Sequence, residues 1–223
     1  MTRDELISDF RAITQDKVEP FLFETADVAR WLADAEAEAA IRGRLLHESQ
    51  DARVCERDVT AGEAGYALHP ALYEITHIGF KPTGATRREH LRLVSTEELD
   101  RTVADWRDLT GPARYAIQGD TTLRLVPTPD QNGTLYLEGY RLPLKSLADN
   151  KLSTPEIHQA SHRHLVHWAL YRAFSTPDAE TLDLGKAADA ERDFTAYFGP
   201  RPDSNLRRIT REDGPQTNKV FFP

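Results

Sequence analysis

The positions of apolar side chains predict two amphipathic helices near the beginning of the chain. Leu6, Phe10 and Ile13 are separated by four and then three residues, the spacing of one helical face, which predicts a short helix around them. A second helix, capped by Thr25 and ending near Gly43, is predicted by another apolar stripe. The members of this stripe are Val28, Trp31, Leu32, Ala35 and Ala39.

The second predicted helix also carries a group of acidic residues. Asp34, Glu36 and Glu38 fall largely on the side opposite the apolar stripe. We therefore expect all three carboxylates to face solvent.

The pattern changes from helical spacing to alternation after residue 50. Alternating small or apolar and charged residues from Ala52 to Val59 predict a strand, and so does the run Leu72 to Phe80, which is rich in Tyr, Ile, Thr and Phe. Ser95 followed by Glu98 predicts a capped helical turn. Three further strand-like runs are Arg114 to Gln118, Thr121 to Val126 and Thr134 to Leu142.

Helical periodicity returns in the last third of the chain. Thr154-Pro155-Glu156 has the composition of a helix start, and Thr176-Pro177-Asp178 repeats that pattern before a final helix that ends at Gly199-Pro200. We expect these two helices to pack as a hairpin.

The order helix, strand, helix predicts an α+β fold. We expect a helical bundle built from the N- and C-terminal helices, with an inserted antiparallel β domain and an extended C-terminal arm, although an ordinary α+β domain fits almost as well. The predicted segments are 1–48 and 151–199 for the bundle, 49–150 for the β domain and 200–223 for the arm.

Composition narrows the class of protein. The 223 residues carry a formal net charge of −8 and are 39% hydrophobic, which predicts a soluble globular protein and argues against a duplex-wrapping one. The acidic N-terminus is unlike a signal peptide, and no run of apolar residues is long enough to span a membrane. The single cysteine, Cys55, excludes an intrachain disulfide, indicates a reducing compartment and is expected to be a buried structural thiol.

No catalytic or cofactor-binding motif is recognisable. The Gly-x-Ser-x-Gly turn and the glycine-rich phosphate loops are both missing. His158 and His162 are four residues apart, as two zinc ligands on a helix would be, but the glutamate of a metalloprotease helix does not lie between them. We therefore predict no enzyme, metal or cofactor, and a His-dependent metal hydrolase is the alternative. We assign His158, His162 and Arg172 as candidate subunit contacts.

The last segment differs from the rest in charge. Residues 200–223 carry five basic and three acidic side chains, a net +2, which leaves −10 for the remainder. An extended basic segment with an apolar end gains little by folding alone and suits docking on a partner, whereas a disordered tail is the alternative. The candidate partner-binding residues are Arg207, Arg208, Arg211, Val220, Phe221 and Phe222.

Several motifs, spread over nearly the whole chain and in the same order, resemble those of the head-to-tail adaptor (connector or neck) proteins of tailed bacteriophages. This group includes podoviral tail tubular proteins and siphoviral head-completion adaptors. The motifs are Asp4–Phe10, Pro20–Phe23, Val28–Ala39, Val59–Leu68, Gly111–Tyr115, Val126–Pro129 and His164–Phe174, followed by the helix Asp178–Phe198.

The resemblance implies a structural protein of the virion neck, made in the host cytoplasm. It implies a ring, usually of twelve copies, that binds the portal protein, with the C-terminal arm reaching the portal and the other side offered to a tail or stopper protein. DNA would pass through the ring without sequence-specific binding, which an acidic body favours. A tail completion or terminator protein is the alternative within the virion.

Overall fold

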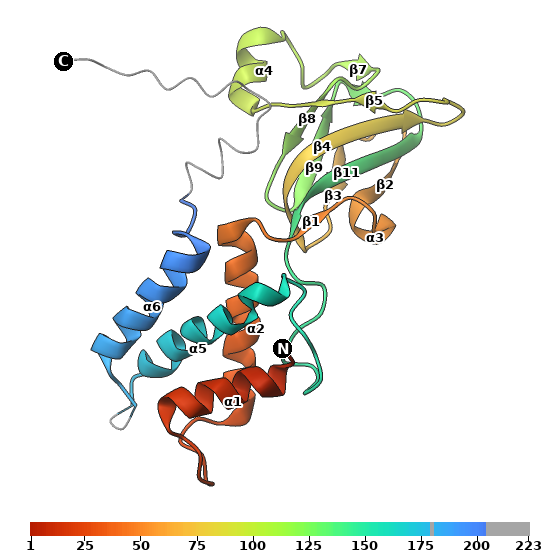
Figure 1. The fold of residues 1–223 in the computed structure, drawn as a ribbon. Coiled ribbons are helices and arrows are strands. Elements are labelled where there is room, and N and C mark those ends of the chain that lie inside the picture. The colour runs from red at the N-terminus through yellow and green to blue at the C-terminus, as the bar shows by residue number, and fades with distance from the viewer. Residues whose placement is uncertain (179–180, 204–223) are drawn as a thin grey trace, which may run out of the picture. The chain divides into compact units, whose positions relative to one another are not determined.

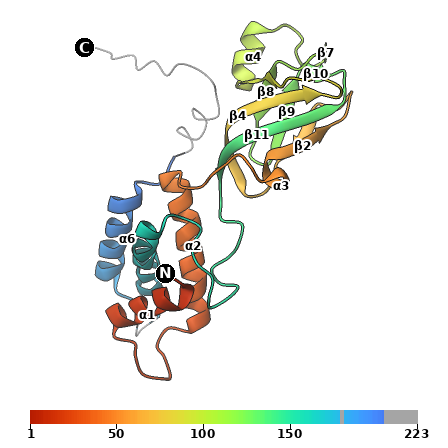
Figure 2. The ribbon, with the colours of Figure 1, turned by 45° about the vertical axis from the view of Figure 1, so that its right-hand side comes forward.

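A computed structural model describes residues 1–178 and 181–203, and these residues form two compact units (Figures 1 and 2). The first unit contains Met1–His47 and Arg141–Pro202, and the second contains Glu48–Tyr140. We call them the helical unit and the β unit. The α+β class is confirmed, whereas all but the first four residues of the predicted arm lie outside the described residues.

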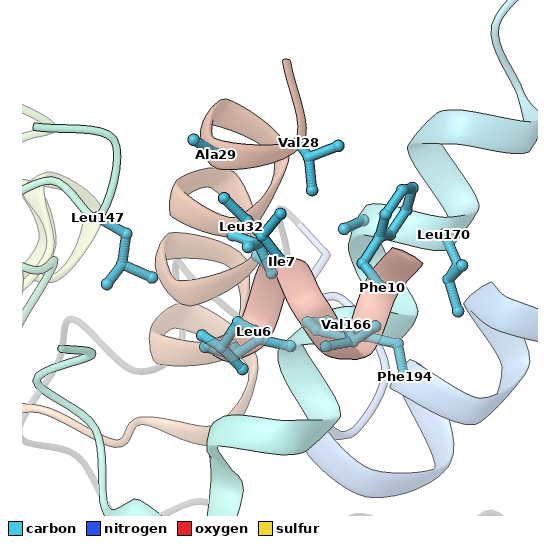
Figure 3. Packing of buried hydrophobic residues seen from close by; sticks show 14 of the residues in the cluster. Leu6, Ile7, Phe10, Val28, Ala29, Leu32, Leu147, Val166, Leu170 and Phe194 are labelled. Atoms are coloured by element: carbon cyan, nitrogen blue, oxygen red, sulfur yellow. The ribbon is translucent and has the colours of Figure 1, made fainter. Parts of the chain in front are cut away.

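The helical unit combines helices from both ends of the chain around one core. Its elements are α1 (Arg3–Thr14), α2 (Thr25–Gly43), the 3-10 helix η1 (Gln159–His164), α5 (Leu165–Phe174) and α6 (Leu184–Phe198). Figure 3 shows Phe10 of α1, Leu32 of α2 and Phe194 of α6 in the same cluster, and all three are fully buried. The predicted α5–α6 hairpin is confirmed by the contact of Trp168 with Phe194, whose ring centroids are 5.0 Å apart.

The first predicted helix is confirmed, and it begins with a capping box. The Thr2 hydroxyl accepts a hydrogen bond from the Glu5 N–H, while the Glu5 carboxylate accepts one from the Thr2 N–H. This reciprocal pair satisfies two donors that a helix start leaves without partners. The inward face consists of Leu6, Ile7 and Phe10, and the prediction for Ile13 is wrong, because its side chain is 57% exposed.

Both C-terminal helices begin later than the sequence predicts. The Glu156 carboxylate accepts hydrogen bonds from the N–H groups of Leu144 and Lys145, so it fixes the preceding loop and caps no helix. Helix α6 begins after Asp183, whose carboxylate accepts from the Lys186 N–H. Asp183 is therefore the N-cap of α6, whereas the sequence pattern predicts a helix start near residue 176.

The β unit contains two sheets and a two-stranded pair. The first sheet has the order β1 (His47–Glu48), β11 (Gly133–Arg141), β4 (Leu72–Pro82) and β5 (Glu89–His90), with β2 (Glu56–Val59) also paired to β11. The second has the order β3 (Gly65–Ala67), β9 (Thr122–Val126), β8 (Tyr115–Gln118) and β6 (Arg92–Leu93). The pair consists of β10 (Thr128–Pro129) and β7 (Thr110–Gly111).

The strands are not all antiparallel, which corrects the prediction for this domain. β6 pairs with β8 in parallel, and β10 pairs with β7 in parallel. The two-residue strands β7 and β10 were not among the predicted strands, whereas β8 lies within the predicted run Arg114 to Gln118. The predicted runs that became β4, β8, β9 and β11 are confirmed.

A close approach between β11 and β4 requires glycine. A Cβ atom on Gly139 would lie 2.1 Å from the Glu74 carbonyl oxygen, well inside van der Waals contact. No other residue fits there without moving one of the two strands.

Two short helices interrupt the β unit. Ala52–Cys55 form α3, capped by the Asp51 carboxylate, so the strand expected from Ala52 to Val59 is limited to β2. Ser95 caps α4 (Thr96–Thr102) by accepting a hydrogen bond from the Glu98 N–H, which confirms the predicted capped turn.

The thiol of Cys55 is buried, as expected, and burial together with the nearby Glu48 and Asp51 carboxylates raises its pKa to about 11. We expect the native protein to react with a thiol reagent such as 5,5′-dithiobis(2-nitrobenzoate) at pH 8 at least about 100-fold more slowly than the unfolded chain, because only the thiolate attacks. Absorbance at 412 nm with and without urea measures this. Equal rates in the two states would show an accessible thiol.

Candidate interaction site

The structure separates the three residues predicted as subunit contacts. His158 and Arg172 are exposed, whereas His162 is buried. The His162 ring contacts the Met1 ammonium group through Nδ1 at 3.0 Å and the Ile157 carbonyl oxygen through Nε2 at 2.9 Å. Because an ammonium group only donates and a carbonyl only accepts, the ring is neutral with its proton on Nε2. Burial lowers the pKa of His162 accordingly.

The spacing of His158 and His162, which suggested a metal site, does not bring the two rings together as ligands. His158 precedes a 3-10 helix and accepts a hydrogen bond from the Ala160 N–H through Nδ1, so it acts as a helix cap. Residues four apart do not share a face in a helix of three residues per turn. Within residues 1–178 and 181–203, no cluster of three His, Cys, Asp or Glu side chains suitable for a metal ion is found, and no helix is suited to crossing a membrane.

A buried ion pair lies near the C-terminal end of α2. The Arg42 Nε donates to the Glu38 Oε1 at 2.9 Å, and the two side chains are only 4% and 9% exposed. The Arg42 guanidinium also lies 5.2 Å from the ring centroid of Trp168 and 5.1 Å from that of Phe194. Our expectation that Glu38 faces solvent is therefore wrong.

The same arginine reaches the end of α6. Its Nη1 donates to the Thr195 Oγ1 at 2.8 Å and to the Gly199 carbonyl oxygen at 3.4 Å. Thr195 in turn donates to the Glu191 carboxylate at 3.1 Å. Arg42 thus connects α2 with the last turn of α6 and with the residue that ends it.

Glu38 is also the partner of the first charged residue after α6. The Arg201 Nε lies 3.4 Å from the Glu38 Oε1, and the Arg201 side chain is 65% exposed. We call Glu38, Arg42 and Arg201, together with the Thr195 hydroxyl and the Gly199 carbonyl that Arg42 contacts, the root clamp. These groups lie where residues 200–223, the C-terminal segment, leave α6.

A second buried carboxylate holds the chain that leads into η1. Glu36 is only 1% exposed, which overturns its predicted position on the surface. Its carboxylate accepts hydrogen bonds from the N–H groups of Glu156 and Ile157. Burial, opposed by these two hydrogen bonds, raises the pKa of Glu36 to about 7. Glu156 is paired with Arg141, whose Nη1 lies 2.6 Å from the Glu156 Oε2.

The loop between α1 and α2 presents apolar side chains from a fixed backbone. Val18 and Leu22 are exposed. The Asp16 carboxylate accepts from the N–H groups of Leu22 and Phe23 and is paired with the buried Arg11 at 2.6 Å. This buried ion pair makes the loop a defined surface feature.

A further exposed apolar residue lies at the start of α6. Leu184 is the first residue of that helix and is 70% exposed. The partner-binding residues predicted in the arm, from Arg207 to Phe222, lie outside the described residues.

The sequence contains a signal for the burial of Glu36, which we predicted to face solvent, but not for the burial of the Glu38–Arg42 pair. Glu36 follows Val28 and Leu32 at intervals of four, so it continues the apolar stripe and does not oppose it. Glu38 and Arg42 have the i, i+4 spacing of a helical ion pair, but that spacing is common on exposed surfaces and says nothing about burial.

Comparison with known proteins adds one match. A family model described as SU10 adaptor protein matches residues 1–218, a range that includes every described residue of both units. No curated protein matches the chain. The match agrees with the resemblance to phage adaptors that the motifs indicate, and it extends over the root clamp and the segment that follows it.

Proposed function

Because the chain belongs to the SU10 adaptor protein family, and is therefore a bacteriophage adaptor protein, we propose that it forms a ring which docks on the portal and connects the DNA-filled capsid to the tail. The observation that carries this proposal is the family match over residues 1–218. The proposed role in the virion is structural and without catalysis, which the adaptor family supports. The neck between capsid and tail is the location that the proposal assigns.

A ring of copies, twelve by analogy with head-to-tail adaptors, requires two different surfaces on each subunit that meet when the ring closes. The exposed residues Val18, Leu22 and Leu184 supply apolar area, and His158 and Arg172 supply exposed polar groups. His162 is a less direct candidate, because its ring is buried in the single chain. Subunit contacts through the helical unit are part of the proposal.

The charge of both units favours a channel that lets DNA pass. The helical unit carries 14 basic and 18 acidic residues, and the β unit carries 10 basic and 15 acidic residues. Net negative charge repels phosphate groups, so neither unit provides the general attraction on which non-specific DNA binding depends. DNA would pass through the ring without being bound by it.

The C-terminal segment is proposed to bind the portal. Residues 204–223 carry four basic and two acidic side chains and include the apolar run Val220-Phe221-Phe222, so they offer both charge and apolar area to a protein partner. The tail or a stopper protein would contact the opposite side of the ring. A tail completion or terminator protein would instead contact the tail tube.

The test is a mixture of the purified full-length protein with purified portal rings, measured by native mass spectrometry and imaged by electron microscopy. We expect additional density of uniform copy number on one end of the portal. Deletion of residues 205–223 is expected to abolish this binding and, in infected cells, to leave DNA-filled heads without tails.

A triple substitution, Arg207→Ala, Arg208→Ala and Arg211→Ala, is expected to weaken portal binding. Its matched control replaces the exposed Arg30, Arg163 and Arg192 by alanine, which changes the charge equally. Normal portal binding by the deletion variant would contradict the role of the segment. Binding of the full-length protein to tail tubes and not to portals would favour the tail terminator.

A further inference from the structure

We propose that the root clamp positions the C-terminal segment for the portal, by fixing the residues at which that segment leaves the helical unit. This inference rests on the proposed function. Arg42 holds the Gly199 carbonyl oxygen at 3.4 Å, and Glu38 holds the Arg201 guanidinium at 3.4 Å. Both holding side chains belong to α2, which is part of the core of the unit.

The chain that follows α6 is held by side chains of α2. The helix ends at Phe198, and Gly199, with φ +91°, turns the backbone out of the helical path. Pro200 and Pro202 have no N–H group to donate. The Gly199 carbonyl and the Arg201 side chain are two points at which this stretch is held, and both contacts lead to the Glu38–Arg42 pair.

The burial of the Glu38–Arg42 pair gives the clamp a rigid base. Arg42 makes its hydrogen bonds with a side chain that is 4% exposed and lies between α2 and α6, against Trp168 and Phe194. A segment that starts from a fixed point loses less conformational entropy on docking than one that starts from a free end. We therefore expect the segment to bind the portal more tightly when the clamp is intact than when the clamp is broken.

Arg201→Ala tests the clamp without removing a buried group, since Arg201 is exposed. Its matched control is Arg192→Ala, which removes a similarly exposed arginine of α6 whose partner, Asp189, is not part of the clamp. A spin label is attached at Ser204→Cys, directly after the clamp, in each full-length variant. The buried Cys55 stays unlabelled under native conditions.

Electron paramagnetic resonance at room temperature then reports the mobility of the label. We expect a sharper, more mobile spectrum in Arg201→Ala than in the parent, and no change in Arg192→Ala. Glu38→Gln, which weakens the attraction for Arg201 but keeps an acceptor for Arg42, is expected to give the same mobile spectrum. Identical spectra in all variants would overturn the clamp.

Portal binding tests the positioning role separately. We expect Arg201→Ala to weaken binding to purified portal rings by about 3- to 10-fold, with an unchanged urea midpoint, and Arg192→Ala to bind like the parent. Greater label mobility without any loss of affinity would overturn the positioning role. If the parent protein itself fails to bind portals, the proposed function is wrong, and the spectra still decide whether the clamp exists.

Discussion

Replacing Arg42 by methionine is expected to lower the free energy of unfolding of the helical unit by about 3 to 4 kcal/mol. The Glu38 carboxylate would remain nearly buried after losing its closest cation, the Arg42 Nε at 2.9 Å. Arg201 lies 3.4 Å away but is largely exposed, so it compensates only in part. Thr195 and the Gly199 carbonyl would also lose their donor. Urea unfolding followed by circular dichroism at 222 nm measures the loss.

The double variant Glu38→Leu, Arg42→Met separates the contribution of the ion pair to stability from that of side-chain packing. Since two well-packed apolar side chains often replace a buried ion pair at little cost, we expect the double variant to be more stable than Arg42→Met alone by about 2 kcal/mol. Arg30→Met is the control on the same helix, because Arg30 is 70% exposed beside Asp27 and should change stability by less than about 0.5 kcal/mol. A loss in the double variant equal to the sum of the two single losses would show that Glu38 and Arg42 are not coupled.

The elements with long, regular periodicity could be predicted from the sequence. α1 and α2 are long enough for several residues of the inner face to repeat, and α1 has a complete capping box. The strands β8, β9 and β11 alternate between buried and less buried residues, so the two-residue period identifies them. In these elements the local pattern and the tertiary packing agree.

The late starts of η1 and α6 could not be predicted, because tertiary contacts override the local signals. Thr154-Pro155-Glu156 has the composition of a helix start, yet the Glu156 side chain is used by Arg141 and by the N–H groups of Leu144 and Lys145. The Glu156 N–H is in turn satisfied by Glu36, which lies 120 residues earlier in the chain. No window of sequence contains both partners.

The candidate site could be predicted only in outline. Charge and composition singled out the C-terminal segment, and collinear motifs indicated the family, which the match over residues 1–218 confirms. The root clamp escaped prediction because an acidic residue on a helix is usually solvated. Glu38 is the exception, since α6 and the chain after it cover the end of α2.

The stability of the helical unit is expected to decrease as the pH rises through about 7, and Glu36 is the cause. Burial raises the pKa of this carboxyl from 4.5 to about 7, so the folded unit holds the proton more tightly than the unfolded chain does. The resulting stabilisation is fully present below pH 4.5 and is lost as the pH rises through 7. Between pH 5 and pH 8 the loss amounts to about 2 to 3 kcal/mol.

Glu36→Gln is expected to remove this pH dependence, because the amide oxygen still accepts hydrogen bonds from the N–H groups of Glu156 and Ile157 but carries no charge. The variant should match the parent near pH 5 and be more stable by about 2 to 3 kcal/mol at pH 8 in urea unfolding. Asp34→Asn makes the same chemical change at an exposed position of α2 and should leave the profile as it is. Parallel profiles of the parent and Glu36→Gln would show that Glu36 titrates normally, and that its contact with the chain before η1 does not require a proton.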